Sequence, residues 1–131
     1  MLLDDIADLL TTGAISTDIY KGFMPEQPDD AFAVIETGGF PAVHAMSSGP
    51  GNASLEHPTF QLIRRSASYV TARNGMQSAF DLLDGLQQRT INGTRYAYVE
   101  ATQSPFNLGR DESERTRIVV NFSAYKELTS V

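Results

Sequence analysis

The chain has 131 residues and a mass of 14.3 kDa, which suits one domain of ordinary size and leaves no room for a second independent core. Sixteen Asp and Glu residues against ten Lys and Arg residues give a net charge of −6, so nonspecific binding to phosphates is disfavoured for the molecule as a whole. The absence of cysteine excludes disulfides and Cys-ligated zinc, and two histidines alone argue against a transition-metal site.

The charge is distributed unevenly along the chain. Residues 1–60 hold nine acids and one base, a net charge of −8, whereas residues 61–131 hold seven acids and nine bases, a net charge of +2. A folded subunit could therefore present one acidic face and one mixed face. The start of the sequence lacks the basic region of a signal peptide, and the longest wholly apolar run, residues 31–35, is too short to cross a bilayer. We therefore expect a soluble protein with no membrane partner.

The first forty residues predict a short helix followed by extended segments. Leucine and isoleucine at helical spacing, with aspartates on the other side, predict an amphipathic helix over residues 2–10. This helix packs against the core or, alternatively, docks a partner. Residues 19–30 contain two prolines and a glycine and predict an extended connection. A strand is predicted over residues 31–36, ended by a turn at residues 38–41.

The middle of the chain predicts a flexible loop and a long strand. Residues 47–54 are small and polar, with two glycines and a proline, a composition typical of a mobile loop. Residues 59–70 predict a strand that carries apolar and basic side chains on both faces. Because a half-exposed strand would alternate apolar with polar residues, this pattern favours a strand that faces its own core on one side and a neighbouring subunit on the other.

The second half predicts one more helix and two more strands. Thr71 is expected to cap a helix over residues 72–88. The Asn-Gly pair at residues 92–93 suits a tight turn before a strand over residues 96–102. A last strand is expected over residues 116–125, after a long and charged connection.

This order of elements predicts the fold class and the domain organisation. Helix, strand, strand, helix, strand and strand favour an α+β fold, with a sheet of about four strands and two helices packed on one face. The whole chain, residues 1–131, is expected to form this single domain, with the flexible loop at residues 47–54.

No arrangement of residues that would carry catalysis stands out. Asp29 and Asp30, or Asp111 with the glutamates after it, could supply an acid pair, but adjacent carboxylates on a strand or loop point apart. His44 and His57 flank the loop at a spacing that no metal site favours. The serines lack a Gly-x-Ser-x-Gly elbow. We therefore predict a protein that is not an enzyme and has no catalytic residues, no metal and no cofactor.

The basic residues form two small groups: Arg64, Arg65 and Arg73, and Arg110, Arg115 and Arg117. Each group offers little charge for nucleic acid, so salt bridges or contacts between subunits are the favoured interpretation. The acids within residues 111–115 could pair with the arginines at 64 and 65 of another subunit.

Several short motifs follow one another in an informative order. They are Met24-Pro-Glu-Gln-Pro-Asp-Asp30 and Gly38-Gly-Phe-Pro41, then Glu56-His-Pro-Thr-Phe-Gln61 with Arg64, Arg65, Ser66 and Tyr69, then Gln103-Ser-Pro105, Gly109-Arg-Asp-Glu112 and Asn121-Phe122. From about residue 1 to 126, this order resembles the bacteriophage minor capsid, or tail terminator, family of long-tailed phages. Each motif is common by itself, so their order and spacing carry the resemblance. Thr37 stands where a tyrosine is more usual.

The resemblance implies a structural virion protein of the tail or neck, made in the host cytoplasm before assembly. Such proteins form a hexameric ring on the last ring of tail-tube protein and stop its polymerisation. The opposite face of the ring meets a head-completion or connector protein. Six subunits of −6 each would carry −36, and an acidic lumen would let DNA pass without specific binding because it repels phosphates.

Candidate site residues follow from combining the implied ring with the charges. The candidates for contacts between subunits or with a partner are Arg64, Arg65, Arg115, Arg117, Asp111 and Glu112. The candidates for a loop that contacts the tube or neck are Ser48, Gly49, Pro50, Gly51 and Asn52. The candidates for an acidic lumen are Asp29, Asp30 and Glu36. The alternative functions are another neck component, such as a head-completion stopper or adaptor, and a small nucleic-acid-binding domain.

Overall fold

The structure is a computed structural model that describes residues 2–13, 15, 17–44 and 53–127. Its helices are α1 (Leu2–Thr12) and α2 (Tyr69–Leu83). Its strands are β1 (Ile19–Lys21), β2 (Ala31–His44), β3 (Ala53–Ser66), β4 (Leu86–Ile91), β5 (Thr94–Ala101), β6 (Phe106–Arg110) and β7 (Thr116–Glu127). Neither helix in this described part is long and apolar enough to cross a membrane.

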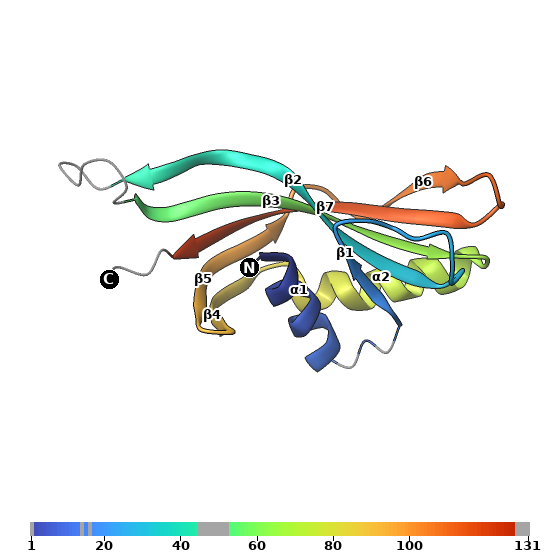
Figure 1. Ribbon diagram of the computed structural model, residues 1–131, viewed down its shortest axis with the longest axis horizontal. Helices are drawn as coiled ribbons and strands as arrows, with labels where there is room; N and C mark the ends of the chain where they lie inside the picture. Colours follow the sequence, from blue (N-terminus) through green and yellow to red (C-terminus); the bar gives the residue numbers. More distant parts are fainter. Residues whose placement is uncertain (1, 14, 16, 45–52, 128–131) are drawn as a thin grey trace.

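The fold is mostly sheet, so the prediction of an α+β fold with about four strands is wrong. In the described residues, seven strands form one curled, mixed sheet in the order β1-β2-β3-β7-β5-β4, and both helices lie on one side of it (Figure 1). Strand β6 also pairs with β7, on the same edge as β5 but farther towards the start of β7. Strands β1 and β2 are parallel, and the other pairs are antiparallel.

Both predicted helices exist, but the second one begins and ends earlier than expected. The side chain of Ser68, rather than that of Thr71, caps α2, by accepting a hydrogen bond from the backbone N–H of Thr71. The helix ends at Leu83 because Asp84 is extended and Gly85 has a φ of +80°. The residues expected to form its last turn instead begin β4.

Strand β2 continues through the predicted turn at residues 38–41, so that prediction is also wrong. Irregular pairing between β2 and β3 around Gly39 absorbs this glycine-rich segment into the strand. A Cβ atom on Gly39 would lie 2.8 Å from the backbone oxygen of His57, so glycine permits the close approach of β3. Pro41 is tolerated because no other described strand pairs with the outer edge of β2 at this point.

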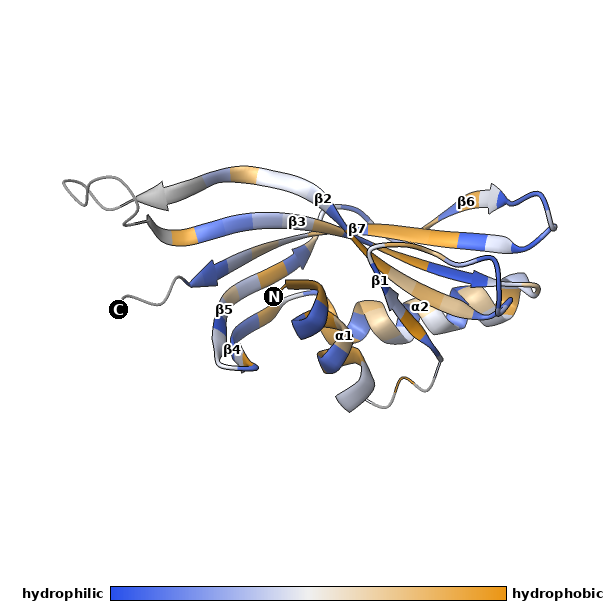
Figure 2. Ribbon diagram, in the orientation of Figure 1, coloured by the Kyte–Doolittle hydropathy of each residue, from blue (hydrophilic) through white to orange (hydrophobic). Residues whose placement is uncertain are grey.

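The core lies between the helices and the inner face of the sheet. Stacked phenylalanines at 60 and 122, with ring centroids 5.1 Å apart, join β3 to β7 beneath α2. Apolar colour is concentrated in the middle of the sheet and on parts of both helices, whereas blue, polar residues are prominent near the end of β7 and in the first half of β3 (Figure 2). We call the part of the sheet that extends beyond the helices the arm; it consists of the end of β2, the start of β3 and the end of β7.

A buried polar contact fastens α1 to the hairpin of β4 and β5. The hydroxyl of Tyr96 donates to a carboxylate oxygen of Asp5 at 2.5 Å, and both side chains are buried. The amide of Asn92 donates to carboxylates of Asp5 and Asp8 on the same helix. Asn92 and Gly93 have φ angles of +51° and +81°, which confirms the predicted tight turn.

Candidate functional site

Two buried arginines hold the connection between β1 and β2 against the sheet. Arg65 lies on the face of β3 opposite the helices, and its guanidinium donates to backbone oxygens of Pro28 and Asp29 in that connection. Arg115, just before β7, donates to the backbone oxygen of Glu26. Because the connection has few backbone hydrogen bonds of its own, these guanidinium groups determine its path.

Arg115 also contacts three carboxylates of its own chain. Its Nε lies 2.9 Å from Asp111, its Nη2 lies 3.2 Å from Glu26, and its Nη1 lies 3.3 Å from Asp29. Burial opposes the positive charge, but the hydrogen bond and charge of Asp111, with the charge of Glu26, outweigh it and raise the pKa of Arg115. We call this group of residues 26–29, Arg65, Asp111 and Arg115 the arginine clamp.

The segment of residues 111–115 is a turn that positions Arg115. One carboxylate oxygen of Asp111 accepts hydrogen bonds from the backbone N–H groups of Ser113 and Arg115, at 3.0 and 2.9 Å. These bonds, first of all the one from the Arg115 backbone, lower the pKa of Asp111. The acid that the sequence offered for a contact with another subunit therefore pairs within its own chain.

Replacing Arg115 by methionine should release the connection that the clamp holds. We expect trypsin to cleave after Lys21 several-fold faster, because the connection loses an ion-pair partner and a donor to its backbone. Fragment masses measured over time provide the readout. Arg95→Met is the matched control, since Arg95 forms an exposed ion pair with Glu127. Equal cleavage rates in the two variants would contradict the clamp.

Arg64 points to the opposite face from Arg65 and is buried beneath α2. Its Cζ atom lies 5.2 Å from the centroid of the Phe32 ring, and its Nη1 donates to the backbone oxygen of Arg65. Burial lowers the pKa of Arg64, and the charge of Asp30 acts in the opposite direction. The Arg64 guanidinium thus makes its contacts within the subunit, between α2 and the side chain of Phe32.

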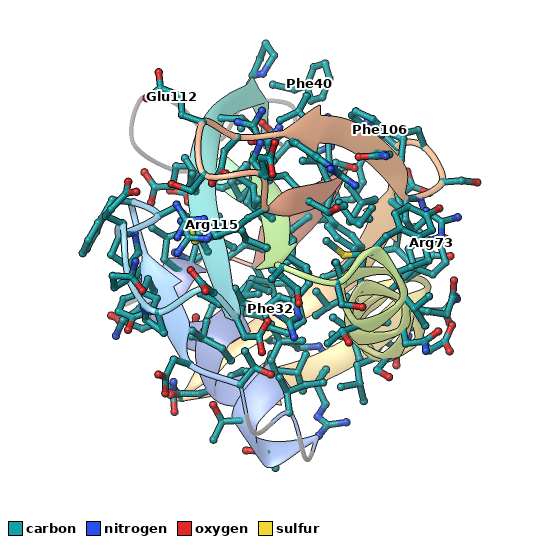
Figure 3. All side chains as sticks on the ribbon, turned by 90° about the vertical axis from the view of Figure 1, so that its right-hand side faces the viewer. Phe32, Phe40, Arg73, Phe106, Glu112 and Arg115 are labelled. Atoms are coloured by element: carbon teal, nitrogen blue, oxygen red, sulfur yellow. The ribbon has the colours of Figure 1, made fainter. Side chains whose placement is uncertain are left out.

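The other candidate residues lie in different places. Glu112 is exposed at the tip of the turn near Arg115 (Figure 3), and Arg117 is half-buried. Asp29 and Asp30 are exposed just before β2, whereas Glu36 lies six residues along that strand, about 20 Å away at the usual rise per residue. The structure does not bring these three acids into one cluster. The predicted loop contacts at residues 48–52 lie outside the described residues.

The arm of the sheet carries an aromatic stack on its outer face. The rings of Phe40, His57 and Tyr125 follow one another across β2, β3 and β7, with centroids 4.6 and 4.0 Å apart. Phe40 is exposed (Figure 3). Reasoning from the sequence considered His57 as a residue beside the flexible loop and missed this stack, because the irregular pairing near Gly39 determines which side chains meet.

Within the described residues, no three His, Asp or Glu side chains come together in a way that could hold a metal ion. A shallow hollow near the arm is lined by Gly38, Phe40, Glu56, His57 and Pro58. It lies against the aromatic stack and leaves the ring of Phe40 exposed.

The proteins that resemble this chain match it over nearly its whole length. The model of the family described as bacteriophage tail terminator protein matches residues 7–128. The chain belongs to the bacteriophage tail terminator family. This membership confirms the resemblance inferred from the motifs and makes the chain a structural protein of the phage tail. No curated protein matches the sequence.

Two solved structures share the fold of this tail terminator family member. A chain from the virion of a native gene transfer agent particle has 17% sequence identity and a TM-score of 0.68, covering 97% of this chain and 95% of that chain. A second structure has 9% identity and a TM-score of 0.58, covering 99% of this chain and 93% of that chain. At these identities the similarity shows the fold alone.

Sequence reasoning selected Arg65 and Arg115 but missed what they contact. The motif that begins at Met24 contains Glu26 and Pro28, whose backbone oxygens accept from the clamp. A signal was present, since a connection with two prolines has few backbone donors and needs side chains from elsewhere to hold it. Nothing in the sequence pattern identified the arginines as those side chains.

Proposed function

We propose that this protein forms a ring that caps the tail tube, stops polymerisation of the tube protein and joins the tail to the head. The observation that carries the proposal is the match to the tail terminator family over residues 7–128. A small domain can form a ring when repeated contacts between two different surfaces of one chain are related by a rotation that closes. The tail-tube protein and a head-completion or connector protein are the proposed partners.

The charge supports a lumen through which DNA passes without specific binding. Net negative subunits repel phosphates, and the exposed Asp29, Asp30 and Glu36 are the proposed lumen residues. Exposed Glu112 and half-buried Arg117 are the members of the predicted interface set most accessible to another subunit or to the head-side partner. The segment of residues 48–52 remains the proposed contact with the tube or neck.

Purified tail tubes provide the test of this function. We expect the protein, added to tubes that lack it, to appear as a ring at one tube end in electron micrographs and to prevent further addition of tube protein. A ring on isolated heads but not on tubes would instead indicate a head-completion stopper. Binding to DNA that falls steeply with added salt would indicate a nucleic-acid-binding domain and would contradict the repelling lumen.

A further inference from the structure

We propose that copies of this chain join head to tail through two different patches on opposite sides of the subunit. The inference rests on the proposed ring and names the surfaces that build it. The α2–β6 patch consists of Tyr69, Val70, Arg73 and Phe106. The β1 patch consists of Asp18, Tyr20, Phe23 and Glu26.

The α2–β6 patch combines exposed apolar side chains with an arginine. Tyr69, Val70 and Phe106 are 49%, 64% and 38% exposed. Arg73 lies one helical turn after the first two, and its Nη1 donates to the backbone oxygen of Pro105 at 2.8 Å. This bond holds the start of α2 beside the start of β6, and Arg73 and Phe106 lie on the same side of the molecule (Figure 3). Apolar side chains gathered at the surface are typical of an interaction site.

The β1 patch lies at the other edge of the sheet and is also aromatic. No other described strand pairs with the outer edge of β1. The rings of Tyr20 and Phe23 are 6.0 Å apart, and Phe23 is 58% exposed. Asp18, which precedes β1, is exposed, and the side chain of Glu26 remains 79% exposed although it contacts Arg115. The blue ribbon of α1 and β1 lies opposite α2 in the end-on view (Figure 3).

The charges around the two patches have opposite signs. Residues 1–30, which include the β1 patch, hold seven acids and one lysine. Arg73 in the α2–β6 patch and the exposed Arg110 at the end of β6 supply positive charge, and residues 61–80 and 101–110 contain no acid. The other two arginines of these segments, Arg64 and Arg65, are buried within the subunit. A twofold contact would place each patch against its own copy and bring like charges together, whereas a head-to-tail contact pairs opposite charges. The second copy of this chain is therefore the occupant that both patches fit.

The absence of native cysteine permits a direct test by cross-linking. Lys21→Cys places a thiol beside the β1 patch, and Thr71→Cys places one beside the α2–β6 patch; both positions are exposed. With the full chain, free at high concentration and bound to purified tail tubes, a short thiol-specific cross-linker should join the two variants when they are mixed. The chain that carries both cysteines should give a ladder of multimers on a denaturing gel.

Two comparisons separate this contact from other arrangements. Lys21→Cys mixed with Gln87→Cys, an exposed position outside both patches, should give only background dimers. Dimers from either patch variant alone would indicate a twofold contact and overturn the proposal. Rings on tubes without cross-links between the patch positions would overturn the proposal and leave the capping function standing. A protein that neither binds tubes nor forms multimers would contradict both.

Discussion

Replacing Gly75 by alanine should lower the free energy of unfolding by about 1–2 kcal/mol, although alanine is the better helix former. A Cβ atom at this position would lie 2.6 Å from Nε and 3.3 Å from Cδ of Arg64. The arginine is buried between α2 and the Phe32 ring, so it has little room to move away. Overpacking of a well-filled site costs about 1–3 kcal/mol, and the gain in helix propensity returns at most about 1 kcal/mol.

A double-mutant cycle identifies the cause. In a chain that already carries Arg64→Ala, the Gly75→Ala change should be neutral or stabilising, because the crowding atom is absent. Asn74→Ala, at an exposed position on the same helix, serves as the control for propensity and should stabilise slightly. Denaturant unfolding of the four chains of the cycle and of the control gives the comparison. If Gly75→Ala stabilises the chain that keeps the native Arg64, the arginine side chain moves away from the added methyl group and the prediction is wrong.

Replacing Tyr96 by phenylalanine should lower the free energy of unfolding by about 1–3 kcal/mol, because it removes a donor from a buried carboxylate. The hydroxyl of Tyr96 lies 2.5 Å from an oxygen of Asp5, and neither side chain is exposed. The contact joins α1 to β5, so its loss should also loosen the helix. Tyr20→Phe makes the same chemical change at a partly exposed ring and should have a much smaller effect.

The same contact predicts a dependence on alkaline pH. Burial, followed by the hydrogen bond to Asp5, raises the pKa of the Tyr96 hydroxyl above its usual value. The folded state therefore holds the proton more tightly than the unfolded state. Its contribution to stability is complete below about pH 10, the usual tyrosine pKa, and is lost as the pH rises through the folded value.

Unfolding curves collected below and above about pH 10 measure this contribution. The free energy of unfolding should fall with pH in the native chain and fall less steeply in Tyr96→Phe. Tyr20→Phe should keep the native slope. Identical slopes in all three chains would show that the buried hydroxyl does not contribute.

The helices could be predicted from the sequence, because each carries apolar residues at helical spacing. The long strands could be predicted only in part: strands were expected over residues 31–36 and 59–70, whereas β2 spans Ala31–His44 and β3 spans Ala53–Ser66. The short strands β1, β4 and β6 have three, six and five residues, and most side chains of β4 and β6 are exposed. Their extended backbone comes from pairing with strands that are distant in sequence, which no local pattern encodes.

The candidate site, too, could be predicted only in part, as its arginines show. Arg65 and Arg115 could be recognised as cations that need partners, but their partners were expected on another subunit. Their partners in the structure are residues 26–29 and Asp111 of the same chain, and three of the acceptors are the backbone oxygens of Glu26, Pro28 and Asp29. Backbone acceptors have no signature in side-chain composition, so only the folded path of the connection reveals them.

The two patches proposed for the head-to-tail contact had only a partial signal in the sequence. The excess of acids near the start of the chain and of arginines later was visible, but the placement of β1 and α2 on opposite flanks is a property of the fold. The exposed aromatic residues Phe23 and Phe106 fit a core as well as a surface when the sequence is considered alone. Phe23 follows the edge strand β1, and Phe106 begins β6, which pairs with β7 alone among the described strands, so neither ring is covered by a further strand.

The place of β7 in the sheet has a consequence for the synthesis of each subunit. Residues 116–127 follow all the other described strands in the chain, yet β7 lies between β3 on one edge and β5 and β6 on the other. Until those residues leave the ribosome, the earlier strands lack the partner that joins them, and their open edges can pair wrongly. Completion of the sheet is thus a late, nonlocal event. A chain that lacks β7 therefore has no continuous sheet.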